Sequence, residues 1–203
     1  MKTCMLVGTL AQAIPEMNCD YIGVDKGALI LARHHIMMEA AVGDFDSIAP
    51  EDVALVERLA CRTIRLNPIK DVSDMMSAID LARQMGYERI IMCGVLGGRA
   101  DHHYVNERLV IMNPDLEIIE LHNAMRIYGK GTYNISKSIY DYISFFPIET
   151  SVVTLTNFKY PLERYIMQKD DLIGLSNEVL DGAVLTVHQG KLLCIRSSDN
   201  KQA

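Results

Sequence analysis

The order of strand-like and helix-like segments constrains the fold of this chain more than any other feature. In the first 121 residues, short apolar runs alternate with segments of helical periodicity. After about residue 123, only short β-like runs separated by turn residues remain. The first pattern is typical of a mostly parallel sheet with helices on both faces, and the second of an antiparallel sandwich or barrel. The sequence therefore predicts an α/β domain over residues 1–122 and a smaller antiparallel β domain over residues 123–203.

The same patterns locate individual elements. The clearest helix is expected from near Asp71 to Gly86, because its apolar residues form one stripe and glycine commonly follows a helix. Residues 184–195 resemble a β-hairpin that closes near Gln189 and Gly190. In the first domain we expect strands at 5–7, 21–24, 40–42, 63–66, 90–93 and 116–121, and further helices at 52–60 and 101–112. In the second domain we expect strands at 125–128, 132–135, 142–146, 151–155, 183–187 and 192–195.

Charge and composition argue against some classes of function. The 203-residue chain has a formal net charge of −6, so we expect no nucleic-acid partner, which would require a positive surface. No apolar run approaches the roughly 20 residues that span a bilayer, and no signal peptide is recognised. The five cysteines are scattered without a Cys-x-x-Cys pair, which is typical of free thiols in a reducing compartment. We therefore expect a cytoplasmic protein without a membrane partner.

An acidic pair follows the third expected strand, in the segment Val42-Gly43-Asp44-Phe45-Asp46-Ser47. Residues two apart on an extended chain point to the same side, so Asp44 and Asp46 are expected to direct their carboxylates at one point. At ~4 Å and an effective dielectric of about 20, two such charges repel by about 4 kcal/mol. A bound cation or a shared proton would relieve that repulsion. The alternative is a surface turn with an Asx cap.

Three further segments place polar groups at expected strand-to-helix turns, the edge of an open α/β sheet where ligands bind. They are Asp25-Lys26-Gly27, Lys70-Asp71-Val72-Ser73-Asp74, and Gly94 to His102. Asp71 or Ser73 is alternatively a simple helix cap. The last segment is rich in glycine, so its N–H groups are expected to approach phosphate oxygens, and Arg99 adds a planar guanidinium suited to phosphate.

These segments predict that the protein binds phosphate groups but does not use a dinucleotide cofactor. Neither Gly-x-x-x-x-Gly-Lys-Ser/Thr nor Gly-x-Gly-x-x-Gly is present, so no dinucleotide cofactor is expected. A site made mainly of carboxylates favours Mg²⁺, which keeps waters and takes phosphate oxygens as further ligands. Phosphoryl-type transfer from a nucleotide is the natural chemistry of such a site, because it needs positioning and charge neutralisation.

In their order and spacing, the four segments resemble the bacterial thiamine pyrophosphokinase family. Gly43-Asp44-Phe45-Asp46-Ser47 and Gly97-Gly98-Arg99-Ala100-Asp101-His102 are the specific pieces, and the likeness extends to Gly174-Leu175-Ser176-Asn177-Glu178 in the second domain. The resemblance implies a Rossmann-like catalytic domain, a β-sandwich domain and a homodimer with a shared active site. It also implies transfer of the terminal diphosphate of ATP to the hydroxyl of thiamine, giving thiamine diphosphate and AMP.

The resemblance carries roles onto individual residues of this chain. It implies Mg²⁺ binding by Asp44, Asp46 and Asp74, ATP binding by Asp25, Lys26, Lys70, Ser73, Gly97, Gly98, Arg99 and His102, and thiamine binding by Ser176 and Asn177. Tyr160 stands near a position where the family often has tryptophan, so it is expected to stack on thiamine or to be a core or rim tyrosine. Lys26 replaces a glycine that is frequent in the family.

For catalysis we expect Asp71, Asp74 and Asp101 to be involved. Arg99 and Lys70 would hold phosphate oxygens, and either Asp71 or Asp101 would accept the proton of the thiamine hydroxyl. Two alternatives are an aspartate-nucleophile phosphatase and a non-catalytic sensor of thiamine or nucleotide. The phosphatase pattern Asp-x-Asp-x-Thr/Val is interrupted by Ile48 and leaves the glycine-rich segment unexplained. A sensor would not need several carboxylates arranged for metal-assisted transfer.

Overall fold

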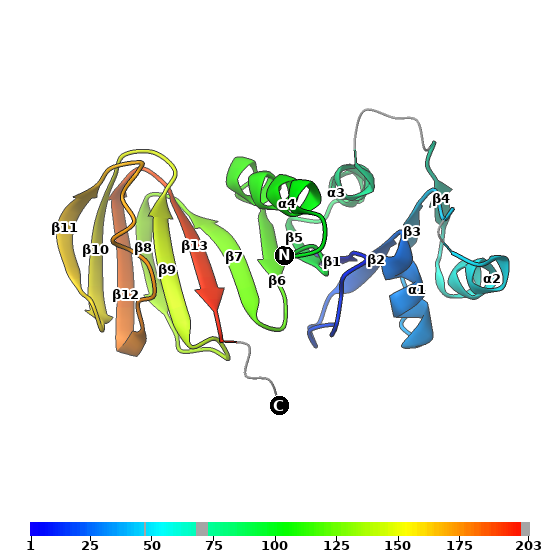
Figure 1. Ribbon diagram of the computed structural model, residues 1–203, viewed down its shortest axis with the longest axis horizontal. Helices are drawn as coiled ribbons and strands as arrows, with labels where there is room; N and C mark the ends of the chain where they lie inside the picture. Colours follow the sequence, from blue (N-terminus) through cyan, green and yellow to red (C-terminus); the bar gives the residue numbers. More distant parts are fainter. Residues whose placement is uncertain (47, 68–72, 200–203) are drawn as a thin grey trace. The chain divides into compact units, whose positions relative to one another are not determined.

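The computed structural model describes residues 1–46, 48–67 and 73–199 (Figure 1). The chain divides into two compact units. The N-terminal unit comprises Met1–Leu109 and Asp115–Leu121, and the C-terminal unit comprises Val110–Pro114 and His122–Ala203. The predicted fold class is confirmed: a mostly parallel sheet with helices is followed by a smaller antiparallel sheet.

The N-terminal unit is built on parallel strands in the order β4-β3-β2-β1-β5-β6. Figure 1 shows α3 and α4 on one face of these strands and α1 and α2 on the other. Because both faces are covered, the central strands are apolar along their length, as in Cys4 to Val7 and Ile90 to Cys93, which are all buried. The strands are β1 (Thr3–Val7), β2 (Asp20–Val24), β3 (Ala40–Gly43), β4 (Thr63–Arg65), β5 (Arg89–Cys93) and β6 (Leu116–Ile119). The helices are α1 (Lys26–Arg33), α2 (Pro50–Leu59), α3 (Asp74–Gln84) and α4 (Ala100–Met112).

The strand order creates a topological switch point between β1 and β5. From β1 the chain adds β2, β3 and β4 on one side, and α3 then returns it to β5 on the other side of β1. Loops that leave neighbouring strands in opposite directions open a crevice at the carboxyl ends of those strands. The fold therefore places a ligand-binding crevice beyond the ends of β1 and β5.

Helix α3 illustrates how the sequence sets local structure. Ser73 is its N-cap, and the Ser73 side chain accepts a hydrogen bond from the Met76 N–H at 3.2 Å. The apolar stripe packs inward, with Ala78 and Ala82 fully buried. Gly86 follows the helix with φ of +78°, a conformation that glycine adopts readily. The predicted end of the helix is confirmed, whereas Asp71, its expected start, lies outside the described residues.

Within the described residues of the C-terminal unit, the strands β7 to β13 pair with one another in antiparallel fashion. β13 pairs with β7 and β9, and a separate four-stranded sheet has the order β11-β10-β12-β8. Side chains such as Phe145, Leu155 and Leu185 pack in one apolar cluster, which joins residues of both sheets. The strands are β7 (Asn123–Tyr128), β8 (Gly131–Ile135), β9 (Tyr142–Pro147), β10 (Ser151–Phe158), β11 (Leu162–Met167), β12 (Val179–Gln189) and β13 (Leu192–Ser197).

The predicted hairpin across residues 184–195 is wrong. β12 pairs with β10 and β8, and β13 pairs with β7 and β9, so the two strands belong to different sheets. Gly190 has φ of +84°, and a Cβ there would overlap the Ser151 hydroxyl. That hydroxyl also accepts the Lys191 N–H at 3.1 Å. The turn therefore carries the chain from one sheet to the other.

Strand β11 was not expected from the sequence. Most of its residues are at least partly exposed, and it lies at the edge of the four-stranded sheet. An edge strand of this kind has no continuous apolar face, so its alternation of apolar and polar residues is weak. The register shift of β10 opposite β11, between Val153 and Leu155, disturbs that alternation further.

The five cysteine thiols are free, as the sequence predicted. Cys4, Cys93 and Cys194 are buried in strands. Burial raises the pKa of the Cys93 and Cys194 thiols to about 12, so these thiols stay protonated at neutral pH. In the described part of the chain, no helix combines the length and the apolar character needed to cross a bilayer.

Candidate active site

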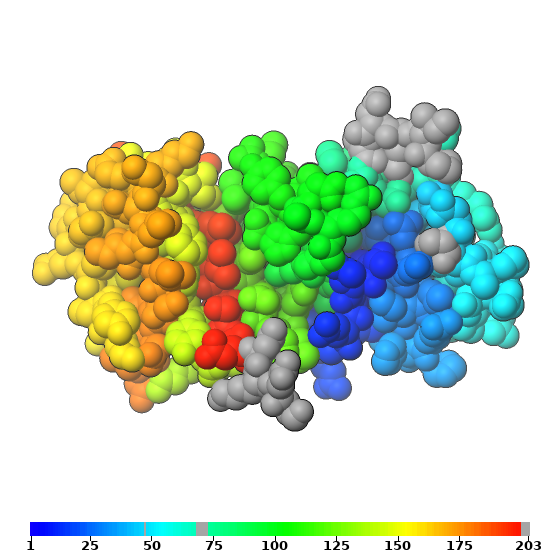
Figure 2. Space-filling model, in the orientation of Figure 1, coloured from blue at the N-terminus to red at the C-terminus, as the bar shows by residue number. Residues whose placement is uncertain are grey.

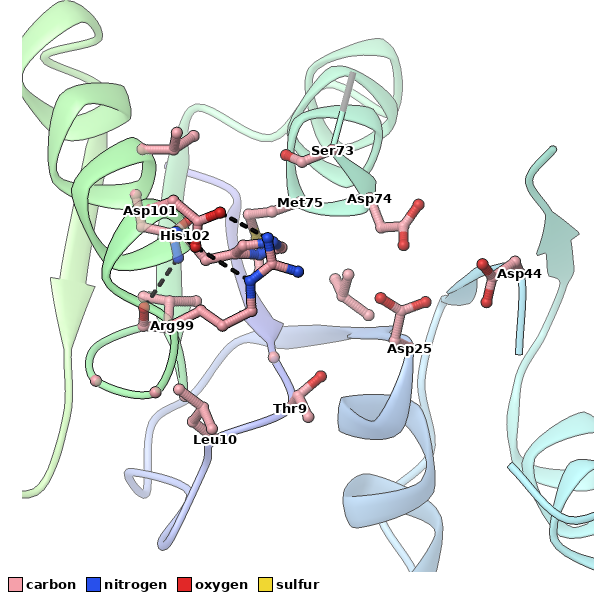
Figure 3. Close-up of a pocket in the computed structure, with 18 residues that line it drawn as sticks. Thr9, Leu10, Asp25, Asp44, Ser73, Asp74, Met75, Arg99, Asp101 and His102 are labelled. Carbon is pink, nitrogen blue, oxygen red and sulfur yellow. Dashed lines mark hydrogen bonds and ion pairs between the residues drawn. The ribbon is translucent and has the colours of Figure 1, made fainter. Parts of the chain in front are cut away.

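A cleft of about 780 Å³ lies at the carboxyl ends of the parallel strands of the N-terminal unit. It opens at the switch point between β1 and β5, and its walls come from the loops that follow β1, β2, β3 and β5 and from the first turns of α3 and α4 (Figure 3). Asp25, Asp44 and Asp74 lie on one side of the cleft, and the glycine-rich loop lies on the other side with Arg99 and its ion-pair partner Asp101. Residues widely separated in sequence thus meet around one cavity.

The acidic side is formed by Asp25, Asp44 and Asp74, whose carboxylates face the same space in Figure 3. Asp25 has φ of +49° and ψ of −123°, a backbone conformation that is strained for a residue with a Cβ. Its N–H donates to the Val42 carbonyl at 2.9 Å, which holds that conformation. A Cβ at Gly43 would overlap the Asp25 carboxylate. Glycine at position 43 therefore makes room for Asp25 rather than only for a ligand.

The extended geometry expected for the acidic pair is wrong. Phe45 has φ of +57°, and the Asp46 N–H donates to Asp44 Oδ1 at 3.1 Å, so the segment is an Asx turn. The buried Phe45 ring packs in the core of the N-terminal unit. Asp44 faces the cleft, whereas Asp46 is exposed and lies outside the cleft lining. The alternative interpretation of this segment as an Asx turn is therefore correct. The turn does not exclude a role in the site, because Asp44 lines the cleft.

The start of α3 brings Ser73 and Asp74 to the cleft. The Ser73 hydroxyl accepts the Met76 N–H, so Ser73 is the N-cap of α3. Asp74 lies in the first turn of α3, where a carboxylate also interacts favourably with the helix dipole. Lys70 and Asp71, the other predicted site residues of this segment, lie outside the described residues.

The glycine-rich loop is shaped by side chains that bind its backbone. The N–H groups of Val95 and Leu96 both donate to Glu120 Oε1, at 2.7 and 2.9 Å. The Gly97 N–H donates to His103 Nδ1 at 2.8 Å. These three N–H groups therefore bind protein acceptors, and the phosphate cradle that the sequence predicted would need other donors.

Arg99 and Asp101 form an ion pair at the edge of the cleft. Arg99 Nε donates to Asp101 Oδ1 at 3.1 Å, and Arg99 Nη2 donates to Oδ2 at 2.6 Å (Figure 3). The hydrogen bond from Arg99 lowers the pKa of Asp101 to about 2. Asp101 is therefore ionised at neutral pH but is a weak proton acceptor. Both side chains are mostly exposed, so the pair adds little to stability.

Of the two remaining residues predicted to bind ATP, His102 and Lys26, only the first lines the cleft. His102 lines it, whereas Lys26, the first residue of α1, is exposed and outside the lining. Sequence reasoning also missed residues of the cleft walls. Those missed are Gly8, Thr9, Leu10, Val24, Met75, Val105 and Asn106. Gly8 and Thr9 follow β1, so the switch-point rule would have found them once the strand order was known.

Two of the residues expected to bind thiamine, Tyr160 and Asn177, are hydrogen-bonded to each other in the C-terminal unit. Asn177 is only 3% exposed, and its Oδ1 accepts the Tyr160 N–H at 3.0 Å while its Nδ2 donates to the Tyr160 carbonyl at 2.8 Å. Ser176 has φ of +53°, and its N–H donates to Ser144 Oγ at 3.0 Å. The Tyr160 side chain is exposed. Figure 2 shows the orange segment around residues 165–180 at the surface of this unit.

The acidic side of the cleft suits a hard divalent cation. Three carboxylates supply oxygen donors, which Mg²⁺ prefers, and Mg²⁺ usually needs only one or two of them besides water and phosphate oxygens. Within residues 1–46, 48–67 and 73–199, no three His, Cys, Asp or Glu side chains form a ready metal-ligand set. The oxygen donors of Asp25, Asp44 and Asp74 fit a hard divalent ion such as Mg²⁺.

The switch-point cleft and its opposed acidic and basic sides define an α/β protein of the class that binds ligands at the carboxyl edge of a parallel sheet. Residues 16–119 match the family model described as thiamin pyrophosphokinase, catalytic domain, and residues 132–192 match the one described as thiamin pyrophosphokinase, vitamin B1 binding domain. This chain belongs to the thiamine pyrophosphokinase family.

Individual relatives agree over nearly the whole chain. Thiamine pyrophosphokinase of Bacillus subtilis (strain 168) is 34% identical over 214 residues, which cover 98% of this chain and 100% of the relative. The crystal structure of thiamine pyrophosphokinase from Bacillus subtilis has a TM-score of 0.86 at 30% identity, over 98% of this chain and 100% of that one. The crystal structure of thiamin pyrophosphokinase from Geobacillus thermodenitrificans has a TM-score of 0.84 at 29% identity, over 99% of this chain and 100% of that one. At 17% identity, the Candida albicans structure shares the fold, with a TM-score of 0.76 over 98% of this chain and 89% of that one.

Proposed function

We propose that this chain transfers a diphosphate group from ATP to the hydroxyl of thiamine, giving thiamine diphosphate and AMP. The observation that carries the proposal is the cleft in which Asp25, Asp44 and Asp74 lie opposite Arg99. The carboxylates on one side suit a metal-bound polyphosphate, and the Arg99 guanidinium on the other side, which is paired with Asp101, suits phosphate oxygens. Membership of the thiamine pyrophosphokinase family supplies the substrates.

We assign the two substrates to the two parts of the chain. Residues 1–122 would bind ATP and the metal, and residues 123–203 would bind thiamine, in agreement with the descriptions of the two matching family models. We further propose a homodimer whose active site combines parts of both copies. The free cysteines support a reducing compartment, and we place the enzyme in the cytoplasm.

The metal in this proposal is Mg²⁺, held through Asp44, Asp46 and Asp74 with Asp25 as a further member of the group. When bound, Mg²⁺ supplies neutralisation of the charge on the phosphates. Asp44 and Asp74 face the cleft directly. Asp46 is exposed beside Asp44 and would act through a bound water. By holding that ion, these carboxylates would position the phosphates of ATP and restrain the AMP portion that leaves.

The basic side of the cleft would bind phosphate oxygens through Arg99 and Lys70, with Gly97, Gly98, Ser73, Lys26 and His102 near the nucleotide. Arg99 is already oriented by Asp101. Since that contact lowers the pKa of Asp101 to about 2, we favour Asp71 over Asp101 as the group that accepts the proton of the thiamine hydroxyl. Asp101 would then orient Arg99.

The thiamine site would include Tyr160, Ser176 and Asn177. The Asn177 side chain bonds both backbone groups of Tyr160, so it would act by holding Tyr160 in place. The exposed tyrosine ring is available to stack on a cationic aromatic ring. The acidic carboxylates would also favour a cationic substrate electrostatically.

The test is incubation of the intact protein with ATP, Mg²⁺ and thiamine, followed by mass analysis of the products. AMP and thiamine diphosphate, formed in equal amounts and only when thiamine is present, would support the proposal. ADP or free phosphate in place of AMP would point to another transfer reaction, and a trapped phospho-aspartate would indicate the phosphatase alternative. Binding of thiamine without turnover would indicate the sensor.

A further inference from the structure

His103 bonds the glycine-rich loop although it was not expected to belong to the site. His103 lies on α4, one turn from the loop, and its Nδ1 accepts the Gly97 N–H at 2.8 Å. On the other side of the ring, His103 Nε2 lies 3.1 Å from Glu107 Oε1. The imidazole thus connects the loop backbone to a carboxylate one turn further along α4.

The hydrogen bond from Gly97 indicates which tautomer the ring adopts. A backbone N–H only donates, so the Nδ1 that receives the Gly97 N–H carries no hydrogen. In a neutral imidazole the ring hydrogen then lies on Nε2, where it donates to Glu107. Glu107 therefore selects the tautomer in which His103 is able to accept from the loop.

The loop needs such a restraint at Gly97. This glycine has φ of +92°, and no atom lies within 4 Å of the position that a Cβ would occupy. Glycine is flexible, and a side chain approaches only the next residue, where a Cβ at Gly98 would lie 3.1 Å from the Leu10 side chain. Nearer β5, Glu120 accepts the N–H groups of Val95 and Leu96, and Asn106 donates to the Val95 carbonyl. The half of the loop that leads to Arg99 is held by His103.

We propose that His103, oriented by Glu107, is a positioning residue that fixes Gly97 and thereby presents Gly98 and Arg99 to the phosphates of the nucleotide. The inference rests on the proposed function, because that function assigns the loop to ATP. His103 does not touch the substrate and acts through the Gly97 backbone. Its loss therefore affects nucleotide binding more than the chemical step.

The first test is nitrogen NMR of the imidazole groups in the intact protein. We expect the neutral Nε2–H tautomer for His103, with an Nδ1 shift typical of a hydrogen-bond acceptor and a Gly97 amide proton that moves upfield in His103→Leu. An Nδ1–H tautomer, or a Gly97 amide unaffected by the substitution, would overturn the proposal. This measurement needs no activity, so it stands even if the proposed function fails.

The second test compares His103→Leu, which removes the acceptor, with His103→Asn, whose Oδ1 lies near the place of Nδ1. In His103→Leu, KM for ATP should rise about fivefold, the effect of losing one neutral hydrogen bond, while kcat and KM for thiamine change less than about twofold. His103→Asn should restore KM for ATP. His34→Leu, at the opposite end of α1 from the cleft, is the control. An unchanged KM in His103→Leu, or an equal loss in His103→Asn, would overturn the proposal.

Discussion

Asp25 is held in a conformation that most residues avoid, and the reason lies in its neighbours. Its N–H bonds to the Val42 carbonyl, and Gly43 leaves space for its carboxylate. Strained backbone of this kind persists where the surrounding structure determines it, and it is common at functional sites. At the residue scale, the acidic side of the cleft therefore depends on a glycine as much as on the carboxylates.

Gly43→Ala should displace Asp25, because the added Cβ would overlap its carboxylate. We expect kcat to fall at least about tenfold and the free energy of unfolding to drop by about 1–3 kcal/mol, the usual range for overpacking. Steady-state kinetics and urea denaturation measure the two effects. Gly129→Ala is the matched control, since no atom lies within 4 Å of its Cβ position. Equal activity in both variants would contradict this account of the site.

Asp44→Asn and Asp46→Asn should each lower kcat by about 100-fold, the size that loss of an electrostatic stabiliser produces. Neither change should lower the melting temperature, because both side chains lie outside the core. Rates at saturating Mg²⁺ and thermal melts measure the effects. Glu51→Gln, an exposed acid in the first turn of α2, is the control. If Asp44→Asn kept a turnover close to that of the parent protein, the proposal that this side of the cleft binds a metal would be contradicted.

The Asp101 carboxyl should titrate near pH 2 in the parent protein and nearer its usual value of 3.8 in Arg99→Gln. Because the folded-state pKa lies below the usual value, the Arg99 contact stabilises the protein above about pH 4. That contribution is lost as the pH falls through about 2. Carbon NMR of the aspartate carboxyl groups measures both values. An unchanged Asp101 pKa in Arg99→Gln would show that another group causes the shift.

At the scale of elements, the turn between β12 and β13 decides the architecture of the C-terminal unit. The two strands follow each other closely in sequence but enter different sheets. Ser151, at the start of β10, holds the crossing, since its hydroxyl donates to Glu149 O at 2.7 Å and accepts the Lys191 N–H at 3.1 Å. Ser151 is fully buried.

Ser151→Ala should therefore destabilise the protein. Its removal takes the hydrogen bonds of the fully buried hydroxyl away from the Lys191 N–H and the Glu149 carbonyl, which costs about 1 kcal/mol of unfolding free energy. Urea denaturation followed by circular dichroism measures the loss. Ser136→Ala, at an exposed serine after β8, should change stability by less than about 0.5 kcal/mol. A loss in Ser151→Ala no larger than in this control would contradict the role given to the hydroxyl.

At the scale of the whole molecule, the proposed homodimer makes a prediction about mixtures. If each active site combines parts of two copies, Asp44→Asn and Tyr160→Ala impair different contributions to it. In a mixed dimer, one of the two sites unites the intact parts and regains activity. Mixing the two inactive variants and measuring AMP release tests this. No regain after subunit exchange, together with a monomeric mass by light scattering, would contradict the shared site.

The sequence predicted a large part of the fold because burial leaves local patterns. The apolar runs at Cys4 to Val7 and Ile90 to Cys93 are buried strands, and Gly86 ends the best helix. Part of the cleft lining was also predictable, since Asp25, Asp44, Asp74 and Arg99 all line the cleft. These features depend on residue type and short-range spacing, which the sequence displays directly.

Other features depended on contacts between residues far apart in the chain. Alternation in β12 and β13 shows which side chains are buried but not which strands pair, so the hairpin prediction failed. At the turn around Phe45, the Phe45 ring is buried in the core, Asp44 lines the cleft and Asp46 lies outside the lining. His103 became part of the site only through its bond to Gly97. The sequence by itself therefore determined the kinds of element and most of the polar residues that line the cleft, whereas the tertiary structure decided which strands pair and which side chains meet, because pairing and packing depend on long-range contacts that no local pattern encodes.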